Sequence, residues 1–187
     1  TYEQLGYQAE SGPWRNFYLT GARELRDPKR VAAMRKLMGD PIPNIQSMSQ
    51  MSPSEYFQYL AIHLNGLKAG SKNYTFQVEL TNDVMKMKGD AAPVWTKLKV
   101  TNGVLNAYFG DKYVNPNDAS IPTIRIPQSV MFGILTDADE TPVQVWNAAL
   151  ANKQASISGG TAQQQQDWSD FVGMLERFEF WFNIVEP

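Results

Sequence analysis

The apolar residues of this chain recur with two different periods, and the change between them predicts how the chain is organised. Near the C-terminus they are spaced three and four residues apart, as on one face of a helix, at Trp168, Phe171, Val172 and Leu175. In the middle they alternate with polar residues, as in strands with one buried face. These alternating positions are Tyr74, Phe76, Val78 and Leu80, followed by Val94, Thr96, Leu98 and Val100. The chain is therefore expected to combine helices with a sheet.

The first part of the chain is predicted to be helical. Apolar residues at helical spacing indicate short helices within residues 2–9, 13–26 and 31–38, separated by Ser11-Gly12 and Asp27-Pro28. Three helices of this length cannot close a core by themselves. Their apolar faces should therefore pack on other surfaces, partly on another chain. The residues expected to make dimer or interdomain contacts are Trp14, Phe17, Tyr18 and Leu25.

A stretch with a glycine and two prolines predicts a domain boundary. We interpret residues 39–52 as a linker between the helical residues 1–38 and a C-terminal domain, residues 53–187. Ser52 followed three residues later by Glu55 predicts a capping box at the start of that domain. The helix that follows is expected to bury one stripe of side chains, consisting of Phe57, Leu60, Leu64 and Leu67.

The elements of the C-terminal domain predict an α+β fold. Asn102-Gly103 lies between two alternating runs and indicates a tight hairpin. Further strands are predicted around Ile124 and Ile126 and at residues 155–157, and helices at residues 128–135 and 142–150, the second capped by Thr141. This order of elements predicts a mainly antiparallel five-stranded sheet covered by helices.

Composition and charge limit the possible functions. The chain has 187 residues, of which 43% are hydrophobic and 19% charged, so it can bury a sizeable core. Its net charge of −2 argues against a nucleic-acid partner, which selects basic surfaces. No apolar run reaches the length of a membrane-spanning helix, and the absence of cysteine excludes disulfides and thiolate metal sites. Because the chain begins with Thr1, we expect a fragment or a processed protein.

No pattern in the sequence predicts an active site. His63 is the single histidine, and a zinc site needs at least three protein ligands. Asp137, Asp139 and Glu140 lack the spacing and the glycine of a calcium loop. Residues 158–161 lack the lysine and the spacing of a phosphate-binding loop. The chain is therefore expected to hold no catalytic residue, no metal and no cofactor.

Three strings of residues resemble a known family. They are GPWRNFYLTGARELR at residues 12–26, YLAIHLNG at residues 59–66 and RFEFWFNIV at residues 177–185. The first resembles the end of the dimerisation region of bacterial linear alkyl sulfatases. These are enzymes of the metallo-β-lactamase superfamily that hydrolyse detergents such as dodecyl sulfate. The other two strings resemble the C-terminal domain of the same enzymes.

The resemblance implies a domain organisation and assigns catalysis to a domain outside this chain. Residues 1–38 would be the tail of a helical dimerisation domain, and residues 53–187 a domain with a sterol-carrier-protein-like fold. The family binds two zinc ions through a His-x-His-x-Asp-His motif, which this sequence lacks. The chain is therefore expected to be the non-catalytic C-terminal region of a zinc-dependent alkyl sulfatase, with the catalytic domain of the parent as its partner. The resemblance also implies a homodimeric parent and a periplasmic or secreted location.

A sterol-carrier-like domain would receive a long-chain alkyl or lipid ligand on its inner apolar faces. Each methylene group of such a ligand gains roughly 0.8 kcal/mol on burial. The residues expected to contact the ligand are Phe57, Leu60, Phe76, Val78, Leu98, Met131, Leu135, Trp146, Phe171 and Leu175. Two alternatives remain open, namely an independent lipid- or sterol-binding module and a purely structural domain with a filled core.

Overall fold

The chain forms two compact units. The computed structural model describes residues 1–38, 48–81, 94–137, 139–177 and 184–185. One unit comprises Thr1–Ile42 together with Glu179–Pro187, and the other comprises Pro43–Phe178. The C-terminal residues thus belong with the N-terminal helices, whereas the domain prediction placed them with residues 53–178. Most of the predicted linker, residues 39–47, lies outside the described residues.

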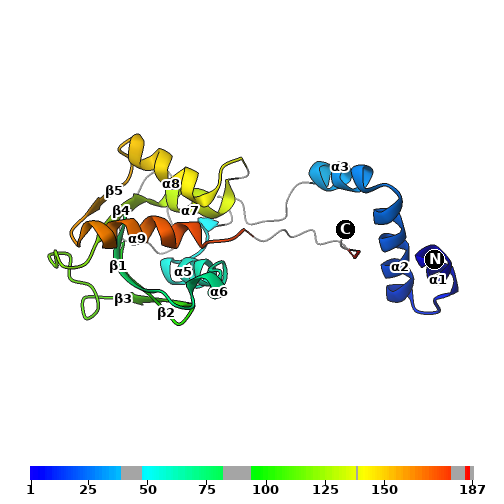
Figure 1. Ribbon diagram of the computed structural model, residues 1–187, viewed down its shortest axis with the longest axis horizontal. Coiled ribbons are helices and arrows are strands. Elements are labelled where there is room, and N and C mark those ends of the chain that lie inside the picture. The colour runs from blue at the N-terminus through cyan, green and yellow to red at the C-terminus, as the bar shows by residue number, and fades with distance from the viewer. Residues whose placement is uncertain (39–47, 82–93, 138, 178–183, 186–187) are drawn as a thin grey trace. The chain divides into compact units, whose positions relative to one another are not determined.

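In the first unit, which we call the helical unit, the described residues form three helices that agree with the sequence prediction. They are α1 (Tyr2–Gln8), α2 (Gly12–Arg26) and α3 (Pro28–Met38) (Figure 1). Pro13 lies in the first turn of α2, where its missing N–H leaves no helical hydrogen bond unmade. The helices α1 and α2 approach closely at Gly6, because a Cβ atom there would lie 2.7 Å from the side chain of Leu19.

The second unit contains the predicted five-stranded sheet. Its strands are β1 (Asn73–Thr81), β2 (Val94–Thr101), β3 (Val104–Phe109), β4 (Thr123–Pro127) and β5 (Ser156–Ser158), in the spatial order β3-β2-β1-β4-β5. Every neighbouring pair is antiparallel except β1 and β4, which are parallel. The α+β class and the mainly antiparallel sheet are therefore confirmed. Asn102 and Gly103, with φ angles of 53° and 77°, form the predicted hairpin turn.

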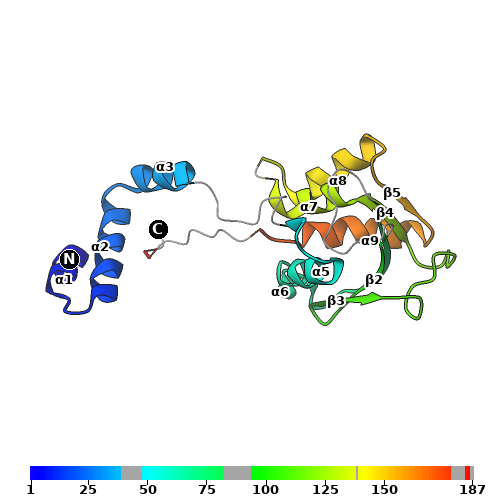
Figure 2. The ribbon, with the colours of Figure 1, turned by 180° about the vertical axis from the view of Figure 1, so that it is seen from behind.

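The described residues of this unit also form five helices, and we call the unit the α+β unit. They are α5 (Pro53–Ile62), α6 (Gly66–Ala69), α7 (Gln128–Thr136), α8 (Pro142–Ala151) and α9 (Ala162–Gly173) (Figure 2). The predicted capping box at Ser52 is confirmed, and Thr141 and Thr161 begin α8 and α9 in the same way. The buried hydroxyl of Tyr56 donates to the carbonyl of Met131 at 2.7 Å and so joins α5 to α7.

One prediction about the first helix of this unit is wrong. The helix α5 ends at Ile62, so Leu67 is not part of its buried stripe and is 97% exposed. A new helix begins because the side chain of Asn65 accepts from the backbone N–H of Lys68 at 2.9 Å. Leu64 meanwhile pairs with Leu175 in an isolated β-bridge. The cap and the bridge together turn the chain away from the helical path.

Truncation of two leucines tests whether the buried stripe of α5 includes Leu60 but not Leu67. We expect Leu60→Ala to lower the free energy of unfolding by about 2–5 kcal/mol, because it opens a cavity at a fully buried position. Leu67→Ala should change it by less than about 0.5 kcal/mol, because the side chain is already in solvent. Urea unfolding of both variants measures the difference, and equal losses would contradict the break in the helix.

Candidate functional site

The ten residues predicted to contact an apolar ligand form one contiguous core. They come from α5, β1, β2, α7, α8, α9 and the residues just after α9, and each is at most 4% exposed. In this core are Phe57, Leu60, Phe76, Val78, Leu98, Met131, Leu135, Trp146, Phe171 and Leu175. The structure thus brings together every member of the predicted set, and their contact with a ligand stays a prediction. In the state described, these side chains pack against one another.

Trp168 is the centre of this core, although the predicted ligand set omitted it. Its ring lies 5.2 Å from that of Phe76, 5.7 Å from that of Trp146 and 5.3 Å from that of Phe171. Edge-on and tilted contacts of this kind are the favoured geometries of aromatic pairs. Its indole Nε1 is buried without a hydrogen-bond acceptor among the described residues, an arrangement that costs about 1–3 kcal/mol. The sequence contained a signal for this central position, because Trp168 belongs to the same helical stripe as Phe171 and Leu175.

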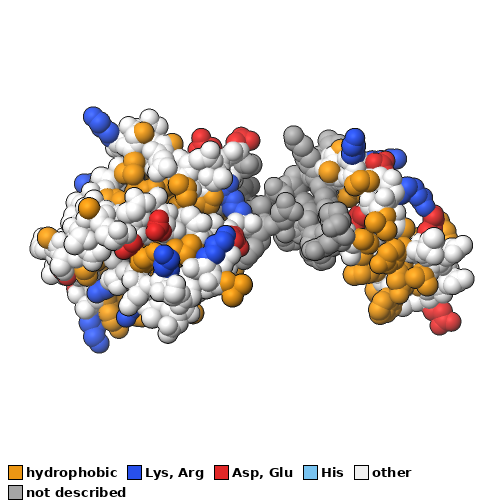
Figure 3. Space-filling view, viewed as in Figure 1, with side chains coloured by type: hydrophobic (Ala, Val, Ile, Leu, Met, Phe, Trp, Pro, Cys, Tyr) orange, Lys and Arg blue, Asp and Glu red, His pale blue; other side chains and the backbone are white. Residues whose placement is uncertain are grey.

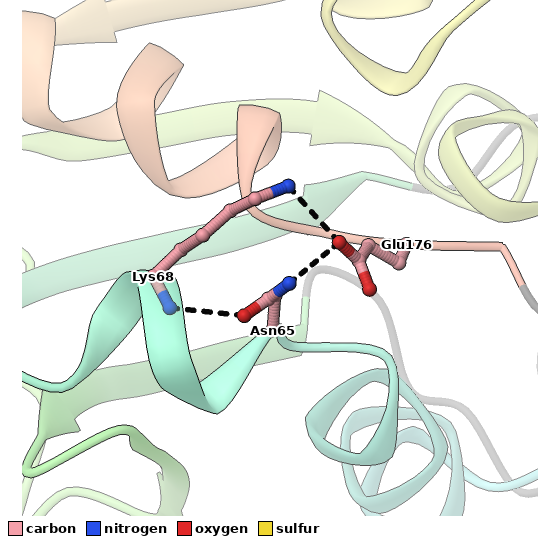
Figure 4. Close-up of polar contacts among 3 residues, drawn as sticks. All are labelled: Asn65, Lys68 and Glu176. Atoms are coloured by element: carbon pink, nitrogen blue, oxygen red, sulfur yellow. Dashed lines mark hydrogen bonds and ion pairs between the residues drawn. The ribbon is translucent and has the colours of Figure 1, made fainter.

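The lone histidine belongs to a polar junction where the chain leaves α9 and crosses the end of α5. We define this junction as His63, Asn65, Lys68 and Glu176. Its backbone is paired, since Asn65 N–H donates to Met174 at 2.9 Å and Glu176 N–H donates to His63 at 2.8 Å. Side chains reinforce the pairing, since Asn65 Nδ2 and Lys68 Nζ donate to Glu176 Oε1 at 2.6 and 3.0 Å (Figure 4). The junction therefore fastens two distant segments.

Two pKa values shift within this junction. The hydrogen bonds from Asn65 and Lys68 hold the pKa of the Glu176 carboxyl below its ordinary value. Burial lowers the pKa of His63, and its contact with the carbonyl of Glu176 at 2.6 Å partly opposes that shift. The neutral ring is thus the form that the folded chain favours. These interactions explain His63 as a structural residue.

Arg177, next in the chain, contacts the end of another helix. Its Nη2 donates to the carbonyls of Ile134 and Gly133 at 3.0 and 3.3 Å, and its Nη1 donates to the carbonyl of Glu140. The carbonyls in the last turn of a helix lack helical partners and attract cations. Partial burial lowers the pKa of Arg177, and the charge of Asp137 opposes this. Sequence reasoning missed this role because the partners are about forty residues apart in the chain.

The helical unit carries a set of exposed apolar side chains. Trp14, Phe17 and Leu25 are 60%, 50% and 58% exposed, and all three lie on α2. Tyr18 is half-buried between the rings of Tyr2 and Trp14, at centroid distances of 6.1 and 5.8 Å. Figure 3 shows hydrophobic side chains gathered on this unit. The structure therefore places the four predicted contact residues along one helix, and we call this surface the apolar face of α2.

Beside this face the first two helices enclose an open hollow of about 370 Å³. Trp14 and Tyr18 line it, so two of the predicted contact residues shape a concave surface as well as an exposed one. The other lining residues are Leu5, Gln8, Ala9, Glu10 and Ser11. A hollow bounded by aromatic rings can receive an apolar side chain from another molecule.

A further site on the helical unit was not predicted. The carboxylate of Glu24 is buried, and its Oε2 accepts from the backbone N–H groups of Ile184 and Val185 at 2.7 and 3.0 Å. Three residues earlier in α2, a Cβ atom on Gly21 would lie 3.1 Å from Val185 and 3.2 Å from Ile184. We call Gly21 and Glu24 the tail seat, because they contact Ile184 and Val185 near the C-terminal end of the chain. Nothing local in the sequence pairs residues that lie 160 positions apart.

Two other kinds of site have no candidate within the described part of the chain. No three side chains of His, Cys, Asp or Glu gather there as metal ligands would. Among the same residues, no helix combines the length and the apolar character needed to cross a membrane.

Comparison with known proteins points to one family. The family described as "Alkyl sulfatase C-terminal" matches residues 42–187, and the one described as "Alkyl sulfatase dimerisation" matches residues 1–28. A linear primary-alkylsulfatase from a Pseudomonas species is 32% identical over 185 residues, which cover 99% of this chain and 23% of that protein. The solved structure of the sec-alkylsulfatase Pisa1 from Pseudomonas has a TM-score of 0.57 and 26% identity, over 100% of this chain and 25% of that one.

These matches differ in extent and in strength. The chain spans about a quarter of the length of the alkylsulfatases that it matches. The solution structure of a possible sterol carrier protein from Thermus thermophilus is a weaker match, with a TM-score of 0.38 and 14% identity over 70% of this chain and 92% of that one.

The buried histidine predicts a pH dependence of stability. Its pKa is lower in the folded chain than in the unfolded chain, so the unfolded chain binds more protons between the two values. Stability should therefore be complete above about pH 6.5, the unfolded pKa, and should decline as the pH falls towards the folded pKa. We expect His63→Gln to flatten this part of the curve.

Denaturant unfolding of both proteins between pH 8 and pH 5 measures the effect. Because His63 is the only histidine, the difference between the two curves isolates its titration from that of the carboxylates. Parallel curves would contradict the burial of a neutral ring.

Proposed function

The chain belongs to the alkyl sulfatase family, and we propose that it acts as the non-catalytic C-terminal region of such an enzyme, where the helical unit supports dimerisation and the α+β unit binds the apolar tail of the substrate. The family membership agrees with the resemblance of the three sequence strings. The dimerisation proposal has the stronger structural support. The tail-binding proposal rests on the chemistry of the core.

The observation that carries the dimerisation proposal is the apolar face of α2. Aromatic and apolar side chains exposed to this extent on one helix are typical of protein interfaces rather than of free surfaces. The face lies within residues 1–28, the segment that matches the dimerisation region of alkyl sulfatases. A second copy of the chain is therefore the partner that we propose. The polar residues on the same helix would remain in solvent at the rim.

The α+β unit is proposed to bind an alkyl chain among the ten core residues. A long-chain alkyl group would gain roughly 0.8 kcal/mol for each methylene that leaves water. Because the core side chains pack against one another, binding requires helices to move apart and the core to open. The same packing favours the alternative of a purely structural domain. An independent lipid- or sterol-binding module is the remaining alternative.

The reaction itself is assigned to the rest of the parent enzyme. We propose that the parent hydrolyses long-chain alkyl sulfates such as dodecyl sulfate, with zinc in a catalytic domain outside this chain. No step of that hydrolysis is assigned to residues of this chain. That catalytic domain would be its covalent partner. A periplasmic or secreted location is part of the same proposal.

A charge placed on the apolar face tests the dimerisation proposal. We expect Phe17→Glu to raise the dimer dissociation constant at least about thirtyfold, because central aromatic contacts contribute about 2 kcal/mol or more. Asn16→Glu, at an exposed position on the opposite side of the same helix, is the matched control and should leave dimerisation unchanged. Sedimentation equilibrium measures both constants, and circular dichroism checks that helix content is equal. A wild-type chain that stays monomeric at all concentrations would refute the proposal.

Titration with alkyl sulfates tests the tail-binding proposal. Replacing Trp14, Trp95 and Trp181 with Phe leaves the buried Trp146 and Trp168 as reporters of the core. Below micelle formation, we expect a saturable fluorescence change with decyl and dodecyl sulfate. The affinity should rise about fourfold for each added methylene, as burial of roughly 0.8 kcal/mol requires. A change that does not saturate, or that ignores chain length, would favour the structural alternative.

A further inference from the structure

The helical unit has almost no interior of its own. Among residues 1–34, whose side chains the structure describes, the buried positions are Gly6, Gly21 and Glu24. Two of these are glycines on which other segments pack, and the third carries a carboxylate. None of the three is an apolar side chain that could drive association. The helices of this unit therefore depend on contacts with other segments.

The segment that covers Gly21 and Glu24 is the C-terminal end of the same chain. Glu24 Oε2 accepts two consecutive backbone N–H groups, those of Ile184 and Val185, at 2.7 and 3.0 Å. A carboxylate that accepts two amide donors makes charge-assisted bonds, which are stronger than neutral ones. Two consecutive donors on one oxygen define the path of the backbone as well as its position.

Gly21 allows this approach. Methyl groups of both residues lie 3.1–3.2 Å from the place that a Cβ atom would occupy, which is closer than side chains normally approach. Glycine is a poor residue for the interior of a helix, because it leaves the backbone more freedom in the unfolded chain. A glycine in the middle of α2 is thus explained by the segment that lies on it. The tail seat combines open space at Gly21 with a side-chain acceptor at Glu24 for two backbone N–H groups.

We propose that the tail seat is a recognition site for an extended backbone, that its occupant is the C-terminal segment of this chain, and that dimer assembly depends on its occupancy. The seat belongs to the same helix as the apolar face, with Gly21 seven residues after Trp14 and four before Leu25. At helical spacing these residues share one side of α2. Ile184 and Val185 therefore contact α2 on the side that carries the apolar face. Their contacts fix the position of the α2 backbone at the proposed dimer contact. The second half of the proposal, on assembly, rests on the proposed dimerisation function.

Two substitutions in the full-length chain test the seat without weakening the helix. Gly21→Leu fills the opening and Glu24→Ala removes the acceptor, and both introduce better helix formers. Gly12→Leu is the matched control, because a Cβ atom there meets nothing within 4 Å. The first readout is amide hydrogen exchange at Ile184 and Val185, followed by NMR.

We expect both amides to be protected in the wild-type chain and in Gly12→Leu. In Gly21→Leu and Glu24→Ala they should exchange at least tenfold faster, while the amides within α2 stay protected. Exchange at the rate of an unstructured peptide in the wild type, or unchanged protection in both seat variants, would overturn the proposal of a seat.

The second readout is the dimer dissociation constant of the same proteins. It should rise tenfold or more in the two seat variants and stay within twofold in Gly12→Leu. Loss of amide protection with an unchanged constant would overturn the dependence of assembly on the seat, while leaving the dimerisation function intact. A monomeric wild type with protected amides would instead refute the dimerisation function and leave the seat established.

Discussion

The α+β unit depends on the contact between the segment that follows α5 and the segment that follows α9. Main-chain hydrogen bonds join His63 and Asn65 to Glu176 and Met174, and the bridge between Leu64 and Leu175 lies between them. These contacts join segments about 110 residues apart. Closing so long a loop costs conformational entropy, so the contact must be supported by other interactions that form with it. The aromatic core around Trp168 and the cap that Arg177 places on α7 provide that support.

The two units obtain their stability by different means. The α+β unit buries a continuous set of large apolar side chains, which is the dominant favourable contribution to folding. The helical unit buries glycines and a carboxylate in its described part and exposes aromatic side chains. Such a unit gains further stability when other surfaces cover it. The C-terminal segment supplies one such surface, and the proposed second copy supplies another. The same chemistry therefore links how this unit is stabilised to what it is proposed to do.

Sequence reasoning succeeded where structure follows from neighbouring residues. The capping box at Ser52, the N-cap at Thr141 and the Asn102-Gly103 turn are patterns within four residues, and each is confirmed. The error at Leu67 had a different origin. Its spacing matched the helical stripe, but the helix had already ended, because Leu64 pairs with a residue near the end of the chain. Periodicity alone cannot register a contact made by a distant segment.

By itself, then, the sequence determined the α+β class, most of the elements, the membership of the alkyl sulfatase family and ten members of the core. It could do so because periodicity, caps and turns act over short distances, and because the family strings are contiguous. Only the tertiary structure decided that β1 and β4 run parallel, that Arg177 caps α7 and that Glu24 receives the amides of Ile184 and Val185. Those contacts join residues between about forty and 160 positions apart. Their partners are selected by the packing of the whole fold, and no local pattern encodes that choice.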